Sequence, residues 1–372
     1  MLLPSLEYFI GGKMCEETQS QNMPEKFVDP NKKKRSWIKV LIFLFVASVF
    51  AGLIWFFIEY KTEIVKEKIA TTSKSDAEEH FNIIIIGWDG VQRDHFKQCY
   101  NQELPECIEG LSNFKKLTDD KFQNLTVTDS ATSTKPGWVQ ILTGYNGQVS
   151  GTIANDNYLT IPLNYSLFEK VSNSYPDIKT VFLASKTDNL GSTCKGEIKS
   201  NGKVEERGEP WCNVKKDVYL FQNGLEENYN VGNKTLATIE ELKNNRFLLF
   251  AHFSQPDSSG HKYGENSIEY SKGIIDNDFW LGQVLAKIED LGIKEKTIIY
   301  VVSDHGFDEN SKSHNDAPLT IYGTNDRDLI RSGDRKDITP TILKKYKINL
   351  QSNNNIPAVD GFSLDTFPTK MR

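Results

Sequence analysis

The sequence predicts a three-layer α/β/α sandwich with a mostly parallel central sheet, preceded by one transmembrane helix. Four short runs of β-branched and aromatic residues, with helical patterns between them, predict the sandwich. The runs are NIIIIG (82–87), TVFLAS (180–185), RFLLFAHF (246–253) and TIIYVVS (297–303). Runs that are apolar on both faces are typical of strands buried in a parallel sheet, whose two faces are covered by helices. An uncharged stretch at residues 40–58 predicts the membrane helix.

The apolar stretch contains nineteen consecutive residues without a charge. As a helix it would span about 28 Å, close to the ~30 Å hydrocarbon core of a bilayer. A cleaved signal peptide has a shorter apolar region followed by small residues, whereas here Glu59, Tyr60 and Lys61 follow. We therefore expect an uncleaved signal anchor at residues 37–58, in preference to a cleaved signal or a buried soluble helix.

The charges that flank the anchor predict its orientation. Five basic residues precede it, and the other flank mixes Lys with Glu; the five are Lys32, Lys33, Lys34, Arg35 and Lys39. The positive-inside rule then predicts a single-pass type II protein with a disordered cytosolic tail at 1–36. Residues 59–79 are expected to form a stalk. Residues 80–372 are expected to form one domain in the lumen of the secretory pathway or outside the cell.

Cysteines and glycosylation sequons agree with this topology. Four of the five cysteines follow the anchor, and an even set in an oxidising compartment favours disulfides. These four are Cys99, Cys107, Cys194 and Cys212. We prefer the pairs 99–107 and 194–212, although four cysteines allow three connectivities. Three N-x-S/T sequons also follow the anchor, and they begin at Asn124, Asn164 and Asn233.

Aspartate and histidine residues follow three of the predicted strands. Asp89 ends the first segment, Asp257 and His261 follow the third, and Asp304 and His305 follow the fourth. A lone aspartate in such a place is more often a helix N-cap. Ligands of open α/β sheets bind beyond the carboxyl ends of the strands, however, so three such segments together favour a metal site. Five ligands exceed one tetrahedral ion, and two ions about 3.5–4 Å apart suit in-line displacement at phosphorus.

The segments GWDG, PDSSGH and SDHG resemble the metal motifs of the alkaline phosphatase superfamily. The closest likeness is to its type I phosphodiesterase/nucleotide pyrophosphatase branch and the related sulfatase-like enzymes. The resemblance extends over residues 82–365 and includes DITPTIL and DGFSL, which resemble the closing helix and turn of these enzymes. It implies an alkaline phosphatase-like fold and two divalent metal ions. Zn²⁺ is favoured over the Ca²⁺ of sulfatases because histidines are among the ligands.

The resemblance also implies which residues hold each ion. The first ion would be held by Asp89, Thr134, Asp304 and His305. The second would be held by Asp257, His261 and His314. The family usually has a glycine near the last of these histidines, whereas Asn315 and Asp316 follow His314 here. Of the remaining histidines, His95 is expected at the surface, and His252 as a core residue or a partner of a metal ligand.

Two hydroxyls in the segment TDSATSTKPGW (128–138) compete as the nucleophile. TDSA resembles the motif of alkaline phosphatases proper and favours Ser130. In the resembling families, however, the nucleophile lies nine residues before a Thr-Gly pair, and Thr143 and Gly144 place it at Thr134. Pro136 suits the first turn of a helix, so Thr134 would lie at a helix N-terminus, which favours anions. The plainer alternative for Thr134 is a helix N-cap.

An asparagine about twenty residues after the nucleophile donates to a phosphoryl oxygen in the resembling phosphodiesterases. Asn155 stands twenty-one residues after Thr134 and could fill this role, although it could also be an ordinary turn residue. Sulfatase chemistry is disfavoured, because it needs a formylglycine made from Cys or Ser, and Thr134 cannot yield that aldehyde.

These features predict a membrane-anchored two-metal phosphodiesterase/pyrophosphatase-type hydrolase that acts through a covalent phospho-threonine. The expected substrate is a small phosphodiester or pyrophosphate of nucleotide or lipid type. A phosphomonoesterase and a phosphoethanolamine-type transferase are the alternatives with the same site, and a sulfatase or a non-enzymatic binding module is less favoured. The net charge of -6 argues against binding to a nucleic-acid polymer, which requires a basic face.

Overall fold

The computed structural model describes residues 43–49, 52–57, 59–61, 82–199, 201–307, 319–329, 331–351 and 356–366. It divides into two compact units, Met1–Asp76 and Ala77–Arg372. The predicted ligand His314, the tail at 1–36 and most of the stalk lie outside the described residues.

The first unit contains a helix, Phe43–Lys61, that is long and apolar enough to cross a bilayer. It has nineteen residues and a mean hydropathy of 2.0, and it is not buried against other parts of the chain. Its described side chains include exposed Phe43 and Trp55. The structure therefore contains the expected apolar helix, and the described part of this helix extends to Lys61.

The second unit is built on an eight-stranded sheet, with the strand order β4-β3-β5-β1-β6-β7-β2-β8. The five strands from β4 to β6 are parallel, β7 is antiparallel to both β6 and β2, and β8 is parallel to β2. The strands are β1 (Asn82–Asp89), β2 (Gln123–Thr126), β3 (Lys179–Ala184), β4 (Leu220–Gln222), β5 (Phe247–Pro256), β6 (Thr297–Ser303), β7 (Leu319–Thr324) and β8 (Gly333–Asp334). The four strands expected from the sequence are the four adjacent strands β3, β5, β1 and β6.

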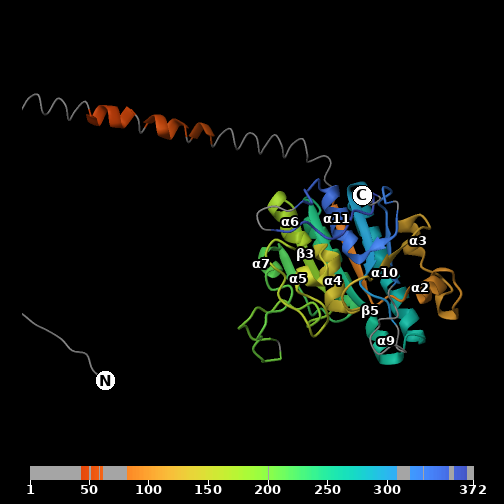
Figure 1. Cartoon of the computed structure of the whole chain (residues 1–372). Coiled ribbons are helices and arrows are strands. Elements are labelled where there is room, and N and C mark those ends of the chain that lie inside the picture. The colour runs from red at the N-terminus through yellow and green to blue at the C-terminus, as the bar shows by residue number, and fades with distance from the viewer. Residues whose placement is uncertain are drawn as a thin grey trace, which may run out of the picture. The chain divides into compact units, whose positions relative to one another are not determined.

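Helices cover the sheet on both sides (Figure 1). The α-helices are α2 (Arg93–Tyr100), α3 (Ser112–Thr118), α4 (Thr134–Thr143), α5 (Gly147–Ser150), α6 (Leu167–Ser174), α7 (Val214–Asp217), α8 (Asn228–Leu242), α9 (Asp257–Tyr263), α10 (Ile268–Asp290) and α11 (Ile338–Lys345). The 3-10 turns are η1 (Pro105–Cys107), η2 (Lys294–Lys296) and η3 (Arg335–Asp337).

Alternate side chains of β1 form two separate cores. Ile84 and Ile86 pack with residues of α2, α3, α8 and α10, whereas Ile83 and Ile85 pack with residues of α4, α6 and α11 on the other face. All four isoleucines are fully buried, and each contributes about 1.5–3 kcal/mol relative to an exposed position. This two-sided burial confirms the three-layer α/β/α sandwich, and it explains why the strand is apolar throughout.

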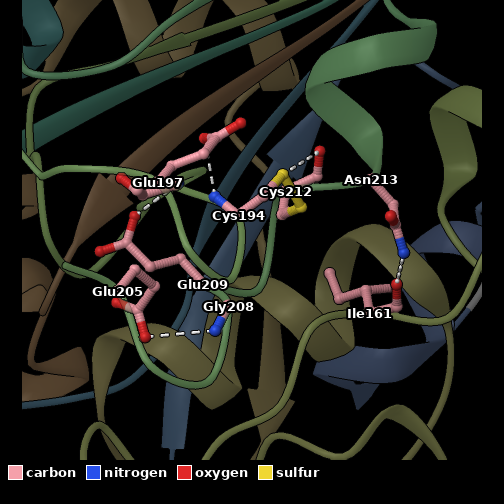
Figure 2. Close-up of a disulfide and its surroundings, with 9 residues drawn as sticks. Ile161, Cys194, Glu197, Glu205, Gly208, Glu209, Cys212 and Asn213 are labelled. Atoms are coloured by element: carbon pink, nitrogen blue, oxygen red, sulfur yellow. Dashed lines mark hydrogen bonds between the residues drawn. A yellow bond between two sulfur atoms is a disulfide. The ribbon is translucent and has the colours of Figure 1, made fainter. Parts of the chain in front are cut away.

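Both preferred disulfides are present. Cys99 and Cys107 join α2 to η1, and Cys194 and Cys212 close a long loop between β3 and α7 (Figure 2). The sequon asparagines lie on different surfaces: Asn233 is exposed on α8, whereas Asn124 on β2 and Asn164 before α6 are half-buried. Glycosylation of these residues stays a prediction.

The expectation that His95 lies at the surface is wrong. His95 is only 8% exposed, because α2 packs against α10. Its Nε2 lies 2.8 Å from Ser271 Oγ, and the ring of Tyr270 meets it edge-on. Burial lowers the pKa of His95. His252, in contrast, is fully buried in β5, in agreement with its expected place.

Candidate metal and phosphoryl-transfer site

Three central, parallel strands end side by side and carry three aspartates to one edge of the sheet. Asp89 is the last residue of β1, Asp257 begins α9 directly after β5, and Asp304 follows β6. Because β5, β1 and β6 are neighbours, their carboxyl ends bring these side chains together, as expected for an open α/β sheet. All three aspartates are buried.

Two histidines complete the cluster. His305 Nε2 lies 3.3 Å from Asp89 Oδ1 and 3.4 Å from Asp304 Oδ2. His261, one turn along α9, places Nε2 3.4 Å from Asp257 Oδ1, and its side chain is more exposed than the others. One ligand atom each of Asp89, Asp257 and His305 lie within 4.8 Å of one another, a spacing that could hold a metal ion. The structure thus brings together all five strand-end residues.

Thr134 is the first residue of α4 and points at this cluster. Its Oγ1 lies 3.5 Å from Asp89 Oδ1 and 3.5 Å from His305 Nε2, and the residue is 2% exposed. The helix approaches closely because Gly137 has no side chain: a Cβ there would lie 2.7 Å from Asp304 Cβ. The N-cap is Ser133, one residue before Thr134, and its side chain makes no capping hydrogen bond. The plainer role of Thr134 as N-cap therefore does not fit the geometry.

Ser130, the competing hydroxyl, has a different environment. It adopts a left-handed backbone with φ 62°, and its Oγ accepts a hydrogen bond from Gln140 Nε2 at 3.2 Å. Gln140 in turn accepts from the buried guanidinium of Arg335. Ser130 therefore belongs to a hydrogen-bond network on the side of α4, whereas Thr134 faces the carboxylates.

Asn155 lies beside the first turn of α4. Its Oδ1 accepts a hydrogen bond of 2.8 Å from the backbone N–H of Lys135, the residue after Thr134. This contact orients the amide and leaves its Nδ2 group for another acceptor. Asn155 therefore lies beside the residue that follows Thr134, and its role as a donor to a phosphoryl oxygen stays a prediction.

Lys186 was not singled out from the sequence, yet it lies at the centre of the site. Its Nζ is 2.6 Å from Asp257 Oδ2, 2.8 Å from Asp89 Oδ2 and 3.3 Å from Thr134 Oγ1. Burial would lower the pKa of Lys186, but the carboxylates of Asp257 and Asp89 raise it above its ordinary value. The ammonium therefore stays charged and balances part of the negative charge of the cluster.

The electrostatics of the cluster fit divalent cations. Burial and the nearby Asp89 raise the pKa of Asp304 to about 7. Burial alone would lower the pKa of His305, but Asp304 and Asp89 raise it to about 9. Asp257 Oδ1 and Asp304 Oδ2 accept no hydrogen bond from the described residues, and their nearest charged partners are His261 and His305 Nε2, each at 3.4 Å. Buried carboxylate oxygens without donors are costly unless a cation binds them, and Asp with His is a ligand set suited to Zn²⁺.

His252 supports the cluster from inside β5. Its Nε2 lies 2.8 Å from Asp89 Oδ2, and both side chains are fully buried. Burial lowers the pKa of His252, which favours a neutral ring that donates this hydrogen bond. Such a contact fixes the orientation of a ligating carboxylate, so His252 is the partner of a predicted ligand.

Arg335 is a further residue that sequence reasoning missed. It is fully buried in η3 and donates to the backbone oxygens of Asp304 at 3.0 Å, Asp129 at 3.1 Å and Ala131 at 3.0 Å. It also donates to Gln140 Oε1 on α4. The Arg335 side chain thus links Asp304, directly after β6, to the segment before α4 and to α4 itself. These contacts fix Thr134 relative to Asp304.

Replacement of Arg335 by methionine is expected to lower the free energy of unfolding by about 3 kcal/mol or more, because several buried acceptors lose a charged donor. Urea unfolding followed by tryptophan fluorescence would measure the loss. Lys336→Met is the matched control, since the neighbouring Lys336 pairs with Asp129 at a partly exposed site and should cost about 1 kcal/mol or less. Equal losses in the two variants would contradict the bracing role of Arg335.

Comparison with known proteins agrees with the resemblance seen in the sequence. Residues 83–363 match the family model described as type I phosphodiesterase/nucleotide pyrophosphatase. A bis(5'-adenosyl)-triphosphatase of Mus musculus is 23% identical over 240 residues, which cover 62% of this chain and 48% of that protein. The chain therefore spans about half the length of the curated relatives that it matches.

Solved structures of the superfamily share the fold. The lipoteichoic acid synthase of Listeria monocytogenes superposes with a TM-score of 0.51 at 14% identity, over 78% of this chain and 76% of that chain. Alkaline phosphatase from the Antarctic bacterium TAB5 superposes with a TM-score of 0.50 at 14% identity, over 73% of this chain and 99% of that chain. These likenesses support the alkaline phosphatase-like fold.

Proposed function

Because the chain belongs to the type I phosphodiesterase/nucleotide pyrophosphatase family, we propose that it hydrolyses phosphodiester or pyrophosphate bonds of small molecules through Thr134. The observation that carries the proposal is the position of the Thr134 hydroxyl. Its Oγ1 lies at the N-terminus of α4 and within 3.5 Å of both Asp89 and His305. A hydroxyl beside metal-binding groups and at the N-terminus of a helix suits attack on a phosphoryl group.

We assign the expected ligands to two divalent metal ions, with Zn²⁺ preferred. One set comprises Asp89, Thr134, Asp304 and His305, and the other Asp257, His261 and His314. When bound, such ions would activate the attacking hydroxyl and neutralise charge on the phosphoryl oxygens. The cluster of Asp89, Asp257 and His305, which draws on both sets, supports a metal site here. So do Asp257 Oδ1 and Asp304 Oδ2, which accept no hydrogen bond from the described residues.

The residues of the chain have separate roles in the proposed reaction. Thr134 Oγ1 gives up its proton to solvent and forms a bond to phosphorus, while the bond from phosphorus to the leaving oxygen breaks and that oxygen keeps the electron pair. Water then cleaves the phospho-threonine ester, which releases the phosphate product and restores the hydroxyl. Asn155 donates to a phosphoryl oxygen through Nδ2, and Lys186, 3.3 Å from Oγ1, contacts the same anionic group.

We also propose that the apolar helix Phe43–Lys61 anchors the enzyme in a membrane in the type II orientation. One helix of suitable length and hydropathy supports the anchor, and the basic residues before it support the orientation. The two disulfides in the second unit favour an oxidising compartment for the catalytic domain. The catalytic domain at residues 80–372 would then act in the lumen or outside the cell.

The reaction class can be tested with the full chain purified in detergent and supplied with Zn²⁺. We expect faster turnover of bis-p-nitrophenyl phosphate than of p-nitrophenyl phosphate, and release of p-nitrophenolate measures both. Faster turnover of the monoester would assign a phosphomonoesterase. Turnover of neither substrate by protein with two bound metal ions would contradict a hydrolase and would favour a transferase that needs its own acceptor.

A further inference from the structure

Lys135, the residue directly after Thr134, is a buried cation whose direct side-chain contacts, among the described residues, are uncharged, although Glu209 and Asp188 lie near enough to act on its charge. It is 6% exposed. Its Nζ lies 3.4 Å from Asn189 Oδ1 and 4.7 Å from the centre of the Tyr158 ring. An amide oxygen and an aromatic face only partly replace the water that a buried ammonium has lost. The side chain is therefore poised to receive an anion.

The carboxylates of the nearby disulfide loop are engaged by other groups. Lys199 Nζ lies 2.5 Å from Glu205 Oε2 and 3.0 Å from Glu209 Oε1. Glu209 Oε2 accepts from the backbone N–H of Thr193 at 2.8 Å. Glu205 Oε1 accepts from the backbone N–H of Gly208, as Figure 2 shows. Glu205 and Glu209 therefore have their hydrogen-bond partners within the loop itself. Lys135 forms no direct ion pair with the described residues.

A second cation contacts the same tyrosine ring. The guanidinium carbon of Arg207 lies 5.6 Å from the centre of the Tyr158 ring, and Arg207 Nη1 donates to the backbone oxygen of Asp156 at 3.0 Å. Arg207 belongs to the loop that the Cys194–Cys212 disulfide closes. An isolated antiparallel bridge pairs Thr152 with Tyr158 and closes a turn between them. Asn155 lies in this turn, three residues before Tyr158. Both cations therefore contact the turn that carries Asn155, the residue proposed to donate a hydrogen bond to a phosphoryl oxygen.

We propose that Lys135 and Arg207, held by Tyr158, form a subsite for an anionic leaving group. The substrate would carry a further phosphate, joined to the reacting phosphorus through an anhydride oxygen, so the preferred class is a pyrophosphate rather than an uncharged ester. An ammonium in direct contact with only neutral groups gains a charge-assisted hydrogen bond when such a phosphate binds. This inference rests on the proposed function, because it assumes that phosphorus is attacked at Thr134.

Two thymidine nucleotides that differ only in their leaving group test the subsite. Thymidine 5'-triphosphate loses pyrophosphate when its α-phosphorus is attacked, and thymidine 5'-monophosphate p-nitrophenyl ester loses p-nitrophenolate. For Lys135→Met in the full chain, we expect kcat/KM to fall about 10-fold or more on the triphosphate, as for loss of one charged hydrogen bond, and less than about twofold on the ester. Lys135→Arg should keep most of the activity on the triphosphate.

The matched control is Lys179→Met. Lys179 also lies over a tyrosine ring, 5.3 Å from the centre of Tyr219, but at the opposite end of β3 from the site. This variant should process both nucleotides like the wild type. An equal loss on both substrates in Lys135→Met would show a merely structural role beside the nucleophile, and no loss on either would also overturn the subsite.

Binding in the absence of turnover separates this inference from the proposed function. Calorimetry at fixed free Zn²⁺ would compare thymidine triphosphate binding to Thr134→Ala and to Thr134→Ala combined with Lys135→Met. We expect the dissociation constant to rise about 10-fold in the double variant, and an unchanged constant would overturn the subsite. If the wild type hydrolyses neither nucleotide, the proposed function fails, while the binding comparison still decides whether the subsite exists.

Discussion

Replacement of Thr134 by alanine is expected to lower the turnover of bis-p-nitrophenyl phosphate by about 10⁴-fold or more, the scale seen when a catalytic nucleophile is removed. The physical reason is that Oγ1 is the hydroxyl that faces Asp89 and His305. Alanine keeps the backbone of α4 and removes the reacting oxygen together with one methyl group. Steady-state release of p-nitrophenolate measures the loss, and mass spectrometry of acid-quenched wild-type enzyme should detect a p-nitrophenyl phosphoryl group on Thr134.

Ser130→Ala is the matched control, because Ser130 is the other candidate hydroxyl, four residues earlier in the same segment. Its Oγ contacts Gln140 rather than the carboxylates, so this variant should keep its turnover within a few-fold of the wild type. Circular dichroism should be unchanged in both variants, and metal content should be unchanged in Ser130→Ala. Full turnover in Thr134→Ala, or a comparable loss in Ser130→Ala alone, would contradict Thr134 as the nucleophile.

The core of the site could be predicted because it depends on local rules. An apolar run that is buried on both faces predicts a central parallel strand, and the residue after its carboxyl end must lie at the ligand-binding edge. Asp89, Asp257 and Asp304 each satisfy this condition, and the structure places them on the three adjacent strands β5, β1 and β6. Thr134 followed from the spacing to Thr143 and Gly144 that the resembling families imply, in agreement with the Pro136 signal of a helix start, and the structure has α4 begin at Thr134.

The residues that brace the site could not be predicted, because only tertiary packing gives them a role. Lys186 follows an expected strand, but nothing in the segment SKTDN marks it as the partner of Asp89 and Asp257. Arg335 lies 195 residues after Gln140 in the chain, and an isolated arginine before an apolar helix is usually a surface residue. Local sequence therefore identifies the reacting groups at strand ends more readily than it identifies Lys186 and Arg335, the buried cations that position these groups.

The edge of the sheet was also missed for a physical reason. β4 and β8 contain three and two residues, which are too few to show a period of two. β7 contains LTIYGT, and its pairing is antiparallel to β6 and β2. A strand that joins a parallel sheet in reverse has no distinct local signal, so the sequence predicted a mostly parallel sheet without locating its antiparallel part.

Removal of metal is expected to abolish turnover and to lower the melting temperature of the second unit. At a free Zn²⁺ concentration of 100 times the dissociation constant, each bound ion stabilises the folded state by about 2.7 kcal/mol. Two ions would raise the melting temperature by roughly 10 °C for a unit of this size. Differential scanning calorimetry of the full chain, with chelator and with Zn²⁺, measures the shift. An unchanged melting temperature would show that the Asp89–Asp257–His305 cluster binds no metal.

The stability cost of replacing Lys186 should depend on bound metal, because Lys186 balances the negative charge of the same carboxylates that metal ions would neutralise. Lys186→Met should cost about 3 kcal/mol in chelated protein, since Asp89 and Asp257 lose their buried cation. With Zn²⁺ bound, the cost should fall to about 1 kcal/mol, because the ions supply the missing charge. Lys345→Met is the matched control: Lys345 also bridges two aspartates, Asp326 and Asp328, but away from the cluster. Its cost should be the same with and without metal, and equal costs for Lys186→Met would contradict its role as a charge partner of the metal ligands.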